Sequence, residues 1–396
     1  MNDKIVAFFG AGSIAEKTFR TGNYKPIIIF DNNSDLYGTT NMGIDIKSPD
    51  EIDKYIDLID HIVITTTSFT EVEKQLKSLG VSENKVNISP VLKSLMYVGR
   101  LESFSGSYLF TSGLPSFSND LSGGGLYLLK IDGKSYKFDK IYSGNCHGFV
   151  FDDASQCYFL TDNNRGIVVL NKKLEEQYVI KTEPGLRPHG ISFLDDDMFA
   201  LGCSFDDSVL IINKKDGAVL SRIGLSNQKL KYKSPQHHLN DVWCDSGTVY
   251  ASMFSVSGNW KRGAFDGGVV MFNADLTTDS IGEFEVVLDH LQMPHNFQIH
   301  ADNHYLCNSL DGQVLGSNRE VIFQSNGFVR GVYATNTTLI VGESRNRNFA
   351  NINSKISNPC IDSYLSIIDR ESGAYRSIQI PPDVSEVHSI LPLYYD

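Results

Sequence analysis

Four histidines in the later part of the chain occupy the same place in a recurring pattern. Each stands at the start of a short apolar run with the composition of a β-strand, and the four are His147, His189, His295 and His388. A fifth copy of the pattern carries Arg330 instead. Neutral imidazoles commonly bind divalent first-row metals, so the four histidines predict a shared site for Zn, Mn, Fe or Ni.

Two other roles are open for the same histidines. Repeat proteins often reuse one polar residue in every repeat to bind a neighbouring backbone, which would make the histidines structural. They could also act as acids and bases without a metal. The change to Arg330 favours a functional ring, because a purely structural repeat has little reason to exchange histidine for arginine.

A second repeat predicts the elements that position these residues. Six segments each begin with a small residue, continue as an apolar strand and end in Asn or Asp: Gly125–Asp132, Gly166–Asn171, Ser208–Asn213, Gly268–Asn273, Gly312–Asn318 and Ser363–Asp369. Their spacing of about 40 to 60 residues is typical of four-stranded propeller blades. Residues 107–396 are therefore predicted to form an all-β six-bladed propeller. We expect the last strand, Val387–Leu391, to join the first blade and close the ring.

The inner strands of a propeller line its central channel, so the patterned residues should converge at one mouth. In the fourth blade the channel residue is ambiguous among His237, His238 and Asn240. Three long loops, 113–124, 254–266 and 344–362, should rise around the same mouth and bring arginines to it. The predicted catalytic set is His238, Arg330, Glu343 and Arg345, with Glu343 as an outer metal ligand or base.

The first ninety residues have a different pattern, in which apolar strands alternate with helical segments. The strand Lys4–Phe9 runs into a glycine-rich turn, and a carboxylate follows the next strand. The residues predicted to bind a nucleotide or nucleotide-sugar are Gly10, Gly12, Ser13 and Asp31. The alternative is a turn that the fold requires without any ligand. Residues 1–90 are thus expected to form a small α/β domain, with 91–106 as a partly helical connector.

Several short motifs in this region occur in a familiar order: Phe9–Gly12, Phe30–Asn33, Tyr37-Gly38, Gly43–Ile46, Ser48-Pro49 and Asp60–Ile64. Over about ninety residues the chain resembles the small Rossmann-like domain of bacterial surface-polysaccharide enzymes. Nucleotide-sugar dehydratases and sugar N-acyltransferases carry such a domain. The resemblance implies a sugar or nucleotide-sugar pathway without specifying a reaction, and the Ser/Tyr-x-x-x-Lys machinery of the dehydratases is not evident in this sequence.

The propeller distantly resembles the gluconolactonase and regucalcin-like class, six-bladed enzymes with a divalent metal on the axis. Asn240-Asp241 is similar to the Asn-Asp pair of that class. That class binds its metal with carboxylates and amides where this chain has histidines. With its histidines, the propeller of this chain instead resembles certain polysaccharide lyases and the amidating lyases. Such likenesses support an axial site but do not define its reaction.

Composition narrows the partners. The 396-residue chain carries a formal net charge of −12, which argues against nucleic acid or an anionic membrane surface as the main partner. No apolar run is long enough for a membrane span, and six scattered cysteines without a CxxC pair suit a reducing cytoplasm. The oligomeric state cannot be inferred.

These features together predict a cytoplasmic enzyme of lyase, epimerase or hydrolase type. Its ligand would be an anionic sugar or nucleotide-sugar in surface-polysaccharide assembly. A non-catalytic propeller that recruits a polysaccharide enzyme and a lactonase-like hydrolase are the alternatives.

Overall fold

The computed structural model describes residues 5–114, 122–274, 280–347 and 356–394. The chain divides into two compact units, residues 1–100 and 101–396. The division falls within helix α3 (Pro90–Glu102), which occupies most of the predicted connector. In the part of the chain that the structure describes, no helix is both long and apolar enough to cross a membrane.

The N-terminal unit contains one six-stranded sheet. Its strands are β1 (Val6–Phe9), β2 (Pro26–Phe30), β3 (Thr40–Asn41), β4 (Ile44–Lys47), β5 (His61–Ile64) and β6 (Val86–Ile88), in the order β3-β4-β2-β1-β5-β6. All neighbouring pairs are parallel except β3 with β4. Alternate residues of β1 enter two separate hydrophobic cores, so the strand is apolar on both faces. Helices α1 (Ser13–Arg20) and α2 (Phe69–Ser78) follow β1 and β5.

The structure does not support the Rossmann-like class predicted for this unit, because the sheet is mixed and has few helices. Between β2 and β5, a β3–β4 hairpin and two short 3-10 helices, η1 (Ser34–Leu36) and η2 (Pro49–Lys54), replace α-helical crossovers. Ser48 caps η2 and Pro49 opens it. A third 3-10 helix, η3 (Glu83–Lys85), leads into β6.

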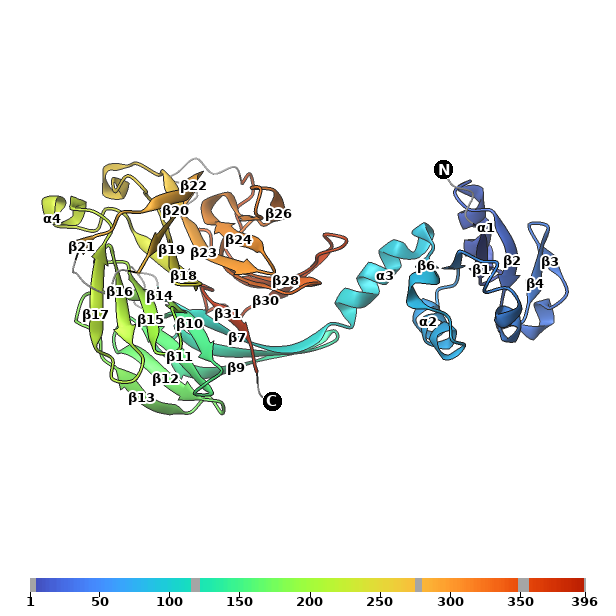
Figure 1. Cartoon of the computed structure of the whole chain (residues 1–396), viewed down its shortest axis with the longest axis horizontal. Helices are drawn as coiled ribbons and strands as arrows, with labels where there is room; N and C mark the ends of the chain where they lie inside the picture. The colour runs from blue at the N-terminus through green and yellow to red at the C-terminus, as the bar shows by residue number, and fades with distance from the viewer. Residues whose placement is uncertain (1–4, 115–121, 275–279, 348–355, 395–396) are drawn as a thin grey trace. The chain divides into compact units, whose positions relative to one another are not determined.

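The second unit is a six-bladed β-propeller, as the repeat predicts (Figure 1). From the inner strand outward, the first three sheets are β31 (Ile390–Pro392), β7 (Ser105–Ser112), β8 (Gly125–Asp132), β9 (Ser135–Ser143); β10 (Cys146–Asp152), β11 (Cys157–Asp162), β12 (Gly166–Asn171), β13 (Glu176–Ile180); and β14 (Pro188–Phe193), β15 (Met198–Cys203), β16 (Ser208–Asn213), β17 (Val219–Gly224), β21 (Ser280–Ile281). The other three are β18 (Leu239–Asp245), β19 (Thr248–Met253), β20 (Gly267–Asn273), β22 (Glu285–Leu291); β23 (Pro294–His300), β24 (Asn303–Asn308), β25 (Gln313–Leu315), β26 (Val321–Gln324); and β27 (Phe328–Ala334), β28 (Thr338–Ser344), β29 (Tyr364–Asp369), β30 (Tyr375–Gln379). Short helices α4 (Gln228–Tyr232), η4 (Trp260–Arg262) and η5 (Ser309–Asp311) lie in the connections.

The end of the chain supplies the inner strand of the first blade. β31 pairs antiparallel with β7, and Ile390 lies opposite Phe110. Val387 and Ile390 share a hydrophobic core with Phe110 of the first blade and Ile367 of the last. Burial of apolar side chains between these two blades therefore holds the ring closed.

The inner strands share an irregularity at their axial ends. The pairing register shifts within each of β10, β14, β18, β23 and β27, close to the patterned polar residue. The alignment of these shifts places Asn240, rather than His237 or His238, at the axial position of the fourth blade. A glycine follows His147 and His189 because neighbouring inner strands come close: a Cβ on Gly190 would lie 2.5 Å from the Cα of Asp241.

Candidate functional site

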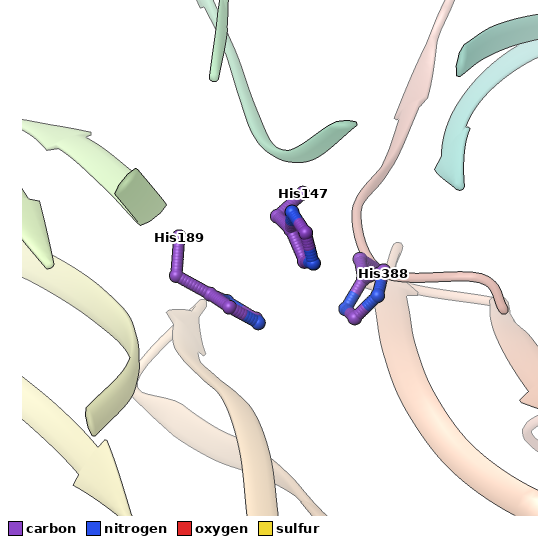
Figure 2. Close-up of side chains that lie close together, drawn as sticks. All are labelled: His147, His189 and His388. Carbon is purple, nitrogen blue, oxygen red and sulfur yellow. The ribbon is translucent and has the colours of Figure 1, made fainter. Parts of the chain in front are cut away.

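Three histidines from consecutive blades converge on the propeller axis (Figure 2). His147 lies on β10, His189 on β14, and His388 just before β31. Their potential ligand atoms all lie within 4.8 Å of one another. The ring centroid of His147 is 4.2 Å from that of His189 and 4.3 Å from that of His388. We call these three residues the histidine triad.

The triad is buried, and its nitrogens are poorly satisfied by the protein. Among the described residues, Nδ1 of His147 and Nδ1 of His189 have no hydrogen-bond partner. Burial lowers the pKa of His147 well below its ordinary value, and that of His388 to about 4. Both rings are therefore neutral near pH 7, which is the form that binds a metal. Buried polar atoms without partners are uncommon and point to a missing ligand or ion.

Gly113, in the segment after β7, lies against the triad. A Cβ on this residue would stand 2.7 Å from Nε2 of His147, 2.8 Å from Oε2 of Glu386 and 2.9 Å from Nε2 of His388. Only glycine fits at this position, because any side chain would meet the polar atoms of His147, Glu386 and His388.

Glu386 is a site residue that the sequence analysis missed. Its Oε2 lies 2.9 Å from Nε2 of His388, while Oε1 lies 3.4 Å from Nη2 of Arg330 and 2.5 Å from Nη1 of Arg347. Burial favours the neutral acid, but Arg330, His388 and Arg347 outweigh it and hold the pKa of Glu386 well below its ordinary value. Its position two residues before His388 was the available signal, since residues i and i+2 of an extended chain face the same side.

Arg330 lies at the axial position of its blade, as predicted, and is 5% exposed. Its guanidinium lies 4.4 Å from the ring centroid of Phe328. Burial lowers the pKa of Arg330 to about 10, against the opposing charge of Glu386, so the side chain stays cationic near pH 7. Nε and Nη1 have no hydrogen-bond partner among the described residues.

His295, the fourth predicted metal ligand, lies beside the triad rather than within it. Its ring centroid is 6.2 Å from that of His189 and 6.3 Å from that of His388. Nδ1 lies 3.0 Å from the carbonyl oxygen of Met293 and 2.8 Å from Oγ of Ser309. Contacts within its own blade therefore fix this ring.

A second carboxylate, Asp241, faces the triad from the fourth blade. Its Oδ1 lies 3.6 Å from Nδ1 of His189, and its Oδ2 accepts a hydrogen bond of 2.9 Å from the backbone N–H of Asn296. Asp241 and Asn296 also line a cavity of about 290 Å³ bounded by the inner strands, together with Gln298 and Ser389. The preceding residue, Asn240, donates its amide to the carbonyl of Pro294.

The other predicted catalytic residues occupy different surroundings. His238 packs on the rings of Phe254 and Trp260, at centroid distances of 4.2 and 4.1 Å. Glu343 accepts hydrogen bonds from the hydroxyls of Ser325 and Ser366, and burial raises its pKa. Arg345 is exposed and donates from Nε to the carbonyl of Ile361. Within the described ranges, no hydrogen bond or ion pair joins these three residues to the triad. Parts of two predicted mouth loops, 115–121 and 348–355, lie outside the described residues.

The residues predicted to bind a nucleotide form a turn in which the carboxylate of Asp31 is hydrogen-bonded to the backbone. Oδ2 of Asp31 accepts the backbone N–H of Ala11 at 2.7 Å, and Oδ1 accepts that of Asn33 at 2.8 Å. Gly10 has φ +110°, and a Cβ there would lie 3.0 Å from backbone atoms of Thr65. Gly12 stands before Ser13 as the N-cap of α1, without a side-chain cap and with open space where a Cβ would be. Nucleotide binding here stays a prediction.

The fold and site define a six-bladed propeller with a buried histidine triad on its axis. Residues 1–87 match the family described as C2185-like, N-terminal, and residues 232–394 match a domain of unknown function, DUF4915. A search of the curated proteins gives no match.

Solved structures show distant resemblance. A protein of unknown function from Bacteroides caccae is 13% identical, with a TM-score of 0.49, covering 73% of this chain and 100% of its own. A luciferin-regenerating enzyme is 14% identical (TM-score 0.44; 62% of this chain, 78% of its own). A gluconolactonase-like protein is 12% identical (TM-score 0.39; 61% and 76%).

Proposed function

We propose that the propeller is a metal-dependent enzyme whose divalent ion binds to the histidine triad. The convergence of His147, His189 and His388 within 4.8 Å carries this proposal. The neutral rings of His147 and His388 support it. So do the triad nitrogens that have no hydrogen-bond partner among the described residues, and the lack of a side chain at Gly113. Three protein ligands leave further coordination positions for water or substrate, as catalytic zinc sites do.

The surrounding residues have separate roles in this proposal. The ion would polarise a substrate carbonyl or hydroxyl, or activate a bound water. Glu386 holds the ring of His388 through Oε2, and Asp241 faces Nδ1 of His189 from the other side. Carboxylates in these positions orient metal-binding imidazoles. Arg330 contributes a positive charge for an anionic substrate group.

The reaction class that suits this arrangement is hydrolysis, lactone hydrolysis included, or lyase chemistry on a hydroxyl-rich anion. We place it in a sugar or nucleotide-sugar pathway of surface-polysaccharide assembly, with a nucleotide or its sugar conjugate at Gly10–Ser13. All six cysteines are free, which fits a reducing cytoplasm. Turnover of simple sugar lactones would distinguish a lactonase from a lyase that acts on sugar acids.

Metal content tests the proposal directly. Protein purified without a metal-affinity tag should contain about one divalent ion per chain by elemental analysis, as expected for a single site. His147→Ala combined with His189→Ala should contain none, whereas His290→Ala should match wild type, because His290 is 83% exposed and pairs only with Asp289 among the described residues. Wild-type protein that stays metal-free after dialysis against Zn²⁺ and Mn²⁺ would overturn the proposal.

A further inference from the structure

Arg330 is a buried cation that the protein leaves incompletely paired. A guanidinium carries five N–H donors, and at 5% exposure few of them can reach bulk water. Among the described residues, Nε and Nη1 have no hydrogen-bond partner, and Nη2 lies 3.4 Å from Glu386. Burial of such a cation without partners is strongly unfavourable, so an anionic partner is expected to complete it.

Glu386 does not fill that role alone, because several groups share its carboxylate. Oε2 is engaged by His388 at 2.9 Å, and Oε1 by Arg347 at 2.5 Å, a shorter distance than the 3.4 Å to Arg330. Two guanidiniums thus face Glu386. The charge of Asp241 also acts on Arg330, but no ion pair joins the two among the described residues. Arg330 is the more deeply buried and the less closely paired of the two arginines, because the Arg347 side chain is 38% exposed.

Arg330 is also close to the triad. It and His388 contact opposite oxygens of Glu386. An anion bound to Arg330 would therefore lie beside the histidines rather than in a separate site.

We propose that Arg330 forms a carboxylate-binding subsite next to the triad, so that the ligand is a sugar acid. This inference rests on the proposed function, in which the triad binds the reacting part of the same molecule. A carboxylate matches the planar fork of the guanidinium, whereas a neutral sugar would leave Arg330 unpaired.

Three probes with one sugar ring separate these possibilities: glucuronate, glucose 6-phosphate and glucose carry a carboxylate, a phosphate and a neutral hydroxymethyl group. Titration calorimetry of metal-loaded wild type should show glucuronate binding most tightly. Arg330→Gln should weaken the binding of glucuronate by about 10- to 100-fold, as expected for the loss of a charge-assisted hydrogen bond to a buried arginine. The weak binding of glucose should not change.

Arg376→Gln is the matched control, since Arg376 donates to the backbone carbonyls of Gly133 and Lys134 and has no contact with the triad among the described residues. It should bind glucuronate like wild type. If Arg330→Gln does not fold, Arg330→Lys keeps the charge but loses the planar fork and should still weaken glucuronate. Equal affinity in wild type and the Arg330 variant, or a preference for glucose 6-phosphate or glucose, would overturn the subsite. Metal content measured on the same samples keeps that outcome separate from failure of the triad to bind metal.

Discussion

The glycine turn of the N-terminal unit and the axis of the propeller differ in how their polar groups are partnered. At the turn, both oxygens of Asp31 accept backbone N–H groups, from Ala11 and Asn33. At the axis, nitrogens of His147, His189 and Arg330 have no hydrogen-bond partner among the described residues. The first arrangement stabilises its own loop, whereas the second is the one to which the proposed ion and anionic ligand would bind.

One glycine in each region, Gly10 or Gly113, differs in what would meet a side chain at its position. Gly10 is required by its positive φ and by the backbone of Thr65. Gly113 is required by polar side chains of the candidate site, because His147, His388 and Glu386 surround its missing Cβ.

The largest expected effect comes from placing a methyl group at the Cβ position of Gly113. Gly113→Ala should weaken Zn²⁺ or Mn²⁺ binding by about 100-fold, because overpacking of about 1–3 kcal/mol would push the donors apart. Gly12→Ala is the control, since nothing lies within 4 Å of its Cβ position. Calorimetric titration of both variants checks this. Unchanged metal affinity in Gly113→Ala would place the ion away from the triad.

A smaller effect is expected for Asp241→Asn, which keeps the size of the side chain but removes its charge near His189. Metal affinity should fall about 10-fold, as for other carboxylates that orient a histidine ligand. The visible spectrum of the Co²⁺-substituted protein should also change, which a purely structural role would not cause.

Asp152→Asn is the matched control for that variant, because Asp152 is also buried on an inner strand but pairs with Lys214 and Ser155. It should leave the Co²⁺ spectrum unaltered. Identical affinities and spectra in wild type and Asp241→Asn would show that Asp241 serves only the backbone of Asn296.

Asp31→Ala tests the glycine turn of the N-terminal unit. The loss of two backbone hydrogen bonds should destabilise the turn locally by about 1–2 kcal/mol, so amide exchange at Ala11 and Asn33 should accelerate in the full chain. The exposed Asp35 gives a control variant with no expected change. Exchange that stays slow, together with a loss of nucleotide binding, would make this turn a ligand site after all.

Much of the propeller could be predicted from the sequence, because each blade repeats a strand pattern and closure follows from counting strands. The axial positions of His147, His189, His388 and Arg330 came from the same repeat. Periodicity shows which face a residue occupies but not how far it reaches. The separation of His295 from the triad therefore depends on contacts with Ser309 that no repeat reveals.

What the sequence could not predict is contact between distant segments. Gly113 and Glu386 meet at the triad only because the ring closes. The apolar strands of the N-terminal unit were predictable, but its class was not, because the β3–β4 hairpin and η2 depend on local turn chemistry around Ser48 and Pro49.

The smallest expected effect concerns His238, whose Nδ1 has no hydrogen-bond partner among the described residues and whose ring packs against Phe254 and Trp260. Burial lowers its pKa from about 6.5 in the unfolded chain to about 3. Below pH 6.5 the unfolded chain therefore takes up a proton that the folded state does not bind, and stability falls as the pH falls towards 3.

His238→Asn removes this titration, and asparagine tolerates the φ of +53°. The unfolding free energy of the metal-free variant should thus decline less than that of wild type between about pH 6.5 and 4.5. The lost stacking should lower both ends of that range equally. An unchanged pH slope would mean that His238 titrates with the same pKa in the folded and unfolded states, and an imidazolium formed beside the triad would return it to the candidate site.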